Sequence, residues 1–269
     1  GFNMLRKHAK IEPERFYYHC DQLGMLVWQD MVNGGSAYKH WFVTYLATLM
    51  NWNHISFSDD EKHAGLLSRL DPEGKDEFRR EITETIAFLY NHPSIVVWVP
   101  FNEGWGQFDA LAVCEQIRTL DSSRLVDHAS GWFDQKGGDI LSLHYYFLKL
   151  KFKPESKRAA ALTEFGGYSL SIPGHSCCKK VYGYKKFNST GALTYGYIDL
   201  IRQTILPAVK KGIGATVYTQ LSDIEEETNG IYTYDREICK IDPDTLRKWN
   251  RALKEAGECK TYADHPTDH

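Results

Sequence analysis

Two glutamates follow directly after apolar runs that have the composition of buried strands. Glu103 lies in "SIVVWVPFNEGWG" and Glu164 in "AAALTEFGG", and in both stretches glycines allow a sharp turn just past the carboxylate. If both runs belong to one parallel barrel, their carboxyl ends open on the same face, where side chains project into the mouth. One protonated and one ionised carboxyl group can then act as general acid and nucleophile on a glycosidic bond.

An ordinary structural role for these glutamates must be weighed against catalysis. A glutamate after a strand is more often a loop residue, a helix-cap partner or a member of an ion pair. That alternative has to explain why both motifs place a charge in apolar, aromatic surroundings, where an unpaired carboxylate is costly. The repeated context favours function over a single motif taken alone.

The elements that would position these residues alternate along the chain. Short β-branched or apolar runs alternate with helical patterns, which predicts βα units and a parallel sheet. Seven strands are predicted: Phe2–His8, Met25–Asp30, Ile95–Phe101, Leu125–Ala129, Ile140–Tyr145, Ala159–Glu164 and Gly214–Gln220. Helices are predicted over residues 12–24, 71–93, 108–120, 191–211 and 243–256, the first of them closed by Gly24.

Two connections are longer than a normal βα loop. Met31–Leu70, after the second strand, is either functional or carries structure of its own, and Ser169–Thr190 is a second such excursion. Seven strands fall one short of the eight that close a (β/α) barrel. Because the chain opens at once on a strand, we expect it to be a fragment of a longer protein.

Composition excludes several classes of partner. The formal charge of −3 shows no basic excess, so nothing electrostatic recruits nucleic acid or an anionic membrane surface. No apolar run approaches the roughly 20 residues that span a bilayer. The six cysteines have no CxxC spacing, which predicts reduced structural thiols and favours the cytoplasm.

The motifs resemble those of a known enzyme family. "NHPSIVVWVPFNEGWG" resembles the fourth-strand signature of glycoside hydrolase family 2, the β-galactosidase, β-glucuronidase and β-mannosidase group, and "LTEFGG" resembles its seventh-strand signature. "GFNMLRKH", "CDQLGMLVWQDM", "DSSRLVDHASGW" and "DILSLHYY" are similar to further strands in the family's order. The resemblance implies an α/β fold, a (β/α)8 TIM barrel without its first strand and helix. Residues 1–269 would form the catalytic barrel domain, with the family's N-terminal β-sandwich domains absent.

The resemblance also implies roles for four residues. Glu103 would be the general acid/base, Glu164 the nucleophile and Asn102 the hydrogen-bond partner of the sugar 2-hydroxyl. Arg6 would hold Glu164 ionised, while Glu103, in a drier aromatic setting, would keep its proton. The alternative for Arg6 is an ordinary ion-pair arginine.

Further strand-end residues are expected to contact the sugar. Aromatic rings stack on sugar faces and polar groups read hydroxyls. The candidates are His8, Asp30, Trp132, His144 and Tyr145, each of which could instead be a core aromatic or a satisfied polar residue. On the last strand Tyr218 stands where such enzymes commonly offer a tryptophan, which leaves the identity of the sugar open.

The predicted function is a retaining β-glycosidase, of β-galactoside type, that needs neither metal nor cofactor. No HExxH motif or phosphate loop occurs, and "DIEEE" (Asp223–Glu227) is interpreted as a solvated acidic loop. The expected partner is a carbohydrate substrate; no nucleic acid or membrane is expected, and homo-oligomerisation stays open. The alternatives are β-glucuronidase or β-mannosidase specificity, or a non-catalytic carbohydrate-binding barrel.

Overall fold

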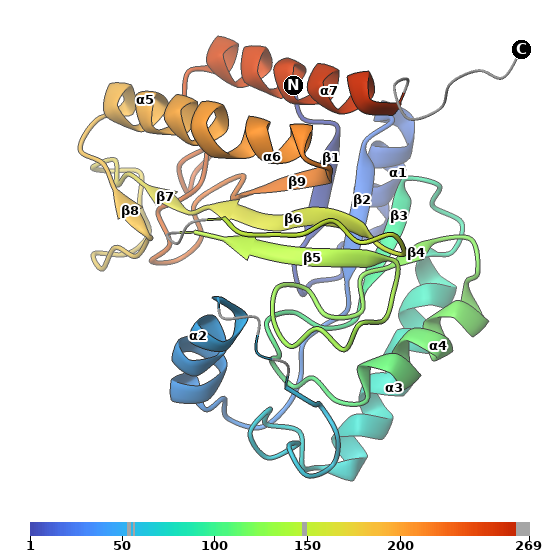
Figure 1. Cartoon of the computed structure of the whole chain (residues 1–269). Coiled ribbons are helices and arrows are strands. Elements are labelled where there is room, and N and C mark those ends of the chain that lie inside the picture. The colour runs from blue at the N-terminus through green and yellow to red at the C-terminus, as the bar shows by residue number, and fades with distance from the viewer. Residues whose placement is uncertain (53–54, 56, 147–149, 262–269) are drawn as a thin grey trace, which may run out of the picture. The chain divides into compact units, whose positions relative to one another are not determined.

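The computed structural model describes residues 1–52, 55, 57–146 and 150–261 (Figure 1). Contacts divide the chain into two compact units. The N-terminal unit comprises Asn3–His144 with Glu155–Ala159. The C-terminal unit comprises Tyr145–Pro154 and the chain from Ala160 on, and it also includes Gly1–Phe2. All seven predicted strands are present, and the printed pairings between them are parallel, so the α/β prediction is confirmed.

The N-terminal unit is built on a parallel sheet in the order β1-β2-β3-β4. The strands are short: β1 Met4–Lys7, β2 Leu26–Asp30, β3 Ile95–Val99 and β4 Leu125–Val126, with β5 Ile140–Tyr145 following in the chain. The helices are α1 Glu14–Leu23, α3 Pro72–Leu89 and α4 Ala110–Leu120. Three of the strands end before their predicted limits, because the chain leaves the ladder to turn at the residues that carry the site.

Local signals explain where two of these helices begin and end. Gly24 takes the left-handed conformation, φ 65°, that closes α1. The side chain of Asp71 caps α3 by accepting hydrogen bonds from the backbone N–H groups of Glu73 and Gly74. Pro72 occupies the first turn. The buried stripe Phe78, Ile82, Ile86 and Leu89 on α3 packs into the core around Trp98 of β3. Burial of such side chains stabilises the fold by about 1.5–3 kcal/mol each.

The long excursion after β2 carries structure of its own. A π-helical turn, η1 Trp41–Leu46, runs directly into α2 Ala47–Trp52. Phe42 is buried and stacks on Phe133, with ring centroids 5.6 Å apart, in a cluster that also holds Leu67 and Trp132. The excursion therefore forms a second small core against the segments that follow β3 and β4.

The C-terminal unit pairs β6 Ala159–Gly166 with β9 Ile213–Thr219 in parallel, and the two-residue strands β7 Tyr168–Ser169 and β8 Lys185–Lys186 pair with each other. The predicted helix over 191–211 is α5 Thr190–Leu200, η2 Ile201–Ile205 and α6 Leu206–Lys210 in one run. Helices α5 and α6 pack on α7 Pro243–Thr261 (Figure 1).

The prediction of a solvated acidic loop is wrong at its first residue. Asp223 is only 2% exposed and accepts a hydrogen bond from Lys240 Nζ at 2.6 Å. Lys240 is fully buried and also donates to the backbone oxygens of Leu170 and Thr228. The ion pair lies within the segment between β9 and α7, and the bond from Lys240 Nζ to the Leu170 oxygen connects this segment to the residue after β7. Glu225 is exposed, as predicted.

Cys20, Cys114, Cys177, Cys178 and Cys239 are free thiols, as predicted, whereas the side chain of Cys259 lies outside the described side chains. Among the helices that the structure describes, none is long and apolar enough to cross a membrane.

Candidate active site

Arg6 and Asp30 form a forked ion pair at the carboxyl ends of β1 and β2. Arg6 Nε lies 2.9 Å from Asp30 Oδ1 and its Nη2 lies 2.8 Å from Oδ2, and both side chains are only 2% exposed. Burial alone would raise the pKa of Asp30, but the Arg6 guanidinium and a hydrogen bond to His8 hold it below the usual range. The bidentate geometry fixes the guanidinium plane, so the pair is a rigid base for its neighbours.

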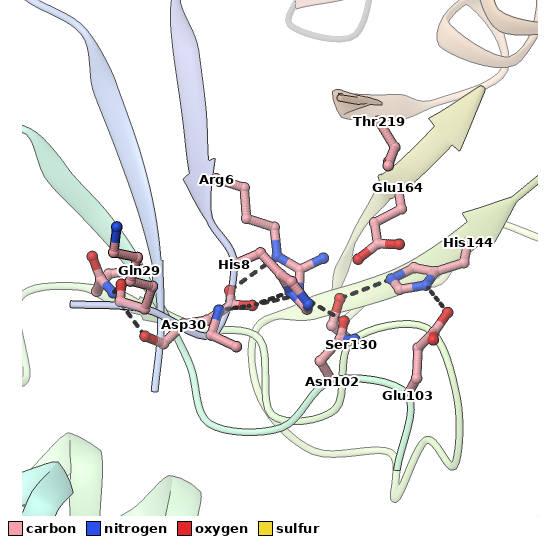
Figure 2. A network of polar contacts seen from close by, with 12 residues as sticks. Arg6, His8, Gln29, Asp30, Asn102, Glu103, Ser130, His144, Glu164 and Thr219 are labelled. Carbon is pink, nitrogen blue, oxygen red and sulfur yellow. Dashed lines mark hydrogen bonds and ion pairs between the residues drawn. The ribbon is translucent and has the colours of Figure 1, made fainter. Parts of the chain in front are cut away.

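Asn102 is held by the same guanidinium. Arg6 Nη2 donates to Asn102 Oδ1 at 2.8 Å (Figure 2). Since the oxygen of the amide accepts from the arginine, its NH2 group is turned the other way, where it can donate to a hydroxyl. Asn102 forms an isolated parallel bridge with Ser130, which continues the β3–β4 pairing past the last ladder residue.

His8 joins this network from the exposed side. Its Nδ1 lies 3.1 Å from Asp30 Oδ2, while its side chain is 51% exposed. Asp30 thus receives contacts from Arg6, His8 and the backbone N–H of Ala9. Of the predicted sugar ligands in the N-terminal unit, His8 has the side chain that solvent reaches most easily.

Glu103 stands in a strained turn immediately after the Asn102 bridge. Its φ is 51°, and Gly104 and Gly106 follow with φ of 71° and 69°, so the predicted glycine-assisted turn is confirmed. A Cβ on Gly104 would lie 2.1 Å from the Phe133 ring. The absence of a side chain at Gly104 therefore lets the Phe133 ring pack against the turn.

His144 contacts the Glu103 carboxyl group. His144 Nδ1 lies 2.8 Å from Glu103 Oε1, and His144 Nε2 lies 3.1 Å from Ser130 Oγ (Figure 2). The Trp132 ring stands beside the imidazole, with centroids 5.6 Å apart. Ser130 was not predicted from the sequence, because a serine in a Gly-containing turn carries no signal of its own.

A second buried carboxyl group lies deeper in the N-terminal unit. Asp127 follows β4 and is fully buried, and neither oxygen has a hydrogen-bond partner of normal geometry among the described residues. Burial raises its pKa to about 6, although the positive charges of Arg6 and His128 and the Ser142 hydroxyl oppose the shift. Asp127 was also absent from the predicted site.

In the C-terminal unit, Glu164 lies two residues before the end of β6. The β6–β9 register shifts between Leu162 and Phe165, where β6 has one residue more than its partner. Such a bulge re-aims a side chain. The Tyr146 hydroxyl donates to Glu164 Oε2 and lies 3.3 Å from Thr219 Oγ1. Tyr145, at the end of β5, was predicted to contact the sugar, whereas the hydrogen bond to Glu164 comes from the residue after it, Tyr146.

The two glycines after Glu164 make room for aromatic rings. A Cβ on Gly166 would lie 2.5 Å from the Tyr218 ring, and one on Gly167 would lie 2.4 Å from Tyr184. Tyr184 stacks on Tyr146 with centroids 4.0 Å apart. The "EFGG" motif therefore lets the Tyr218 ring and the stacked Tyr184–Tyr146 pair approach the end of β6. The hydroxyl of Tyr146 in this pair donates to Glu164.

Tyr218 occupies a core position. It is 7% exposed, packs edge-on against Phe165 and Tyr197, and its hydroxyl has no hydrogen-bond partner within the described part of the chain. Burial raises its pKa. The next residue but one, Gln220, instead donates to Glu227 Oε2 at 2.9 Å and Asn229 Oδ1 at 2.6 Å. The packing favours the core alternative for Tyr218, and its sugar-binding role stays a prediction.

Each unit thus holds one glutamate in a polar network at a strand end. Glu103 shares its unit with Arg6, Asp30, Asn102 and His144, and Glu164 shares its unit with Tyr146. The predicted action of Arg6 on Glu164 and the role of Tyr145, half-buried at the end of β5, stay predictions. A carboxyl group has two oxygens, so one can accept a hydrogen bond from the protein while the other exchanges a proton or attacks carbon.

Curated relatives are glycosidases of several specificities. Beta-galactosidase of Leuconostoc mesenteroides is 25% identical over 277 residues, covering 97% of this chain and 24% of the relative. Beta-mannosidase B of Thermothelomyces thermophilus is 32% identical over 94 residues, covering 35% of this chain and 8% of the relative. The chain therefore spans less than a quarter of the length of either protein.

Solved structures and a family model agree on the fold. A β-glucuronidase of Ruminococcus gnavus superposes with a TM-score of 0.62 at 15% identity, covering 94% of this chain and 45% of that one. A family 2 β-galacturonidase of Eisenbergiella tayi gives 0.55 at 17%, covering 96% and 44%. Residues 1–206 match the family model described as "Glycosyl hydrolases family 2, TIM barrel domain". The chain has the α/β TIM-barrel fold and belongs to glycosyl hydrolase family 2.

Proposed function

We propose that this chain is the catalytic barrel of a retaining β-glycosidase. Glu103 protonates the departing glycosidic oxygen while Glu164 attacks the anomeric carbon, which forms a covalent glycosyl-enzyme. Water then attacks that carbon from the opposite face as Glu103 takes its proton, and Glu164 leaves. Membership in family 2 supports the reaction class.

The observation that carries the proposal is the construction around Glu103. One oxygen of this carboxyl group is bound by His144, and the preceding Asn102 is locked by the buried Arg6–Asp30 fork. A glutamate without function would not need to be held at a positive φ, followed by a glycine that leaves room for Phe133. It would also not need a buried ion pair that holds the residue before it. In this scheme the Asn102 amide donates to the sugar 2-hydroxyl, and Tyr146 steadies Glu164 for attack.

The proposed substrate is a β-galactoside. One relative that aligns along nearly the whole chain is a β-galactosidase. A β-mannoside is the second candidate, because the higher local identity is to β-mannosidase B over about a third of this chain. Sugar specificity depends on contacts with individual hydroxyls, so it has to be measured.

The test is hydrolysis of aryl β-galactoside, β-mannoside and β-glucuronide by the purified protein. We expect turnover of the galactoside and a loss of at least about a thousandfold in Glu164→Gln, because the nucleophile cannot be replaced by an amide. The exposed Glu225→Gln serves as the matched control and should leave the rate unchanged. Sugar binding without turnover of any substrate by the unaltered protein would favour the non-catalytic barrel instead.

A further inference from the structure

The His144 side chain is fully enclosed, and both ring nitrogens contact protein groups. Its side-chain exposure is 0%; Nδ1 lies 2.8 Å from Glu103 Oε1 and Nε2 lies 3.1 Å from Ser130 Oγ. A carboxylate can only accept a hydrogen bond, whereas a serine hydroxyl can donate one. Nδ1 therefore carries a proton that it donates to Glu103, while Nε2 shares a hydrogen bond with the Ser130 hydroxyl, which can donate or accept.

The donation from Nδ1 suits both protonation states of Glu103. When the carboxyl group carries a proton on Oε2, its Oε1 still accepts from Nδ1–H; when the proton has left, the same bond becomes charge-assisted. No proton has to move on the histidine between the two halves of the reaction. Oε1 is thus the held oxygen, and Oε2 is the one that exchanges a proton with leaving group or water.

The surroundings of His144 fix its ring in this place. Ser130 also binds Glu103 directly, because its backbone oxygen accepts from the Glu103 N–H at 2.8 Å. Ser142, two residues before His144 and on the same face of β5, lies 3.2 Å from Ser130 Oγ. A Cβ on Gly131 would lie 2.6 Å from His144 Nδ1, so only glycine leaves room for the ring there.

We propose that His144 is a positioning residue for Glu103 and not a ligand of the sugar. It holds Oε1 so that Oε2 faces the glycosidic oxygen in both half-reactions. The inference rests on the proposed function, since it assigns a partner to the acid/base. A histidine that only fills space would affect all substrates alike, whereas a residue that positions the acid affects those that need acid assistance.

The test compares His144→Asn with His144→Gln. The asparagine amide reaches the place of Nδ1 and can keep the bond to Glu103, whereas the glutamine amide reaches the place of Nε2 and keeps the bond to Ser130. Both are measured on two aryl glycosides of the sugar that the unaltered protein hydrolyses. Dinitrophenolate leaves without protonation, while 4-methoxyphenolate needs its proton.

We expect His144→Gln to lower kcat/KM for the methoxyphenyl glycoside by about 10–100-fold and for the dinitrophenyl glycoside by less than about threefold. His144→Asn should retain most of both rates. Equal losses on the two substrates, or rescue by glutamine and not asparagine, would refute the inference. An unaltered protein that hydrolyses no aryl glycoside would refute the proposed function itself, and that outcome is seen before any variant is compared.

Discussion

At the scale of single residues, the guanidinium of Arg6 has a geometric task that charge alone cannot perform. Its fork binds both Asp30 oxygens and one nitrogen reaches Asn102. Arg6→Lys keeps the charge but not the planar donors, so we expect kcat/KM to fall by about 10–100-fold, the loss typical of a misplaced catalytic group. Arg118→Lys, at an exposed ion pair on α4, is the control and should stay within about twofold. Equal rates in both variants would contradict the positioning role.

Asp127 gives the fold a pH dependence that can be measured. Its folded pKa of about 6 lies above the ordinary value of 3.8, so the folded state binds more protons between these pH values. Stability contributed by the protonated form is therefore complete below about pH 4 and is lost as pH rises toward 6 and beyond, up to about 3 kcal/mol in total. Arg6, His128 and Asp30 are the charges that face this group.

The check is the free energy of unfolding of Asp127→Asn and the unaltered protein in denaturant at pH 4, 5, 6 and 7. The contributions of other titrating groups cancel when the two free energies of unfolding are subtracted. The stability of the variant relative to the unaltered protein should therefore increase as pH rises across this window. A difference that stays constant with pH would show that Asp127 is ionised, or protonated, throughout.

At the scale of elements, the turn after β4 is shaped for the histidine that it faces. Gly131 and Gly174 have nearly the same φ, 85° and 84°, but a Cβ on Gly131 meets the His144 ring and one on Gly174 meets nothing within 4 Å. Alanine at either site should cost about 1 kcal/mol of backbone strain. Only Gly131→Ala should also lower activity, by tenfold or more, which parallel unfolding and rate measurements would reveal. Equal activity in both variants would mean that the ring can shift without consequence.

The strands could be predicted from the sequence better than the contacts between them. Alternation and glycine positions are local signals, so all seven strands and the turns after Glu103 and Glu164 were recognised. The bond from Tyr146 depends on a bulge in β6 and on Gly167, and the partnership of His144 with Ser130 depends on how two segments pack. Neither leaves a pattern in the chain. The helix η1–α2 was missed because its buried face, Phe42 and Val43, is too short to establish a period.

At the scale of the whole molecule, the family's chemistry needs both glutamates at one bond. Retention requires the two carboxyl groups about 5–5.5 Å apart, and each comes from a different unit of the chain. When alanine replaces a catalytic carboxylate, azide can take its place in the reaction. The anomeric configuration of the glycosyl azide then shows from which face azide attacked. In Glu103→Ala azide should take the place of water on the glycosyl-enzyme and give a β-glycosyl azide. In Glu164→Ala it should take the place of the nucleophile and give the α-anomer.

The anomers are distinguished by the coupling constant of the anomeric proton in the NMR spectrum of the azide product. In Glu103→Ala azide should restore the rate only with a dinitrophenyl glycoside, since this variant has no acid to assist a poorer leaving group. The same anomer from both variants would mean that the two carboxyl groups do not stand on opposite faces of the sugar. In that case the roles assigned to Glu103 and Glu164 would have to be abandoned together, because retention by double displacement depends on that opposition.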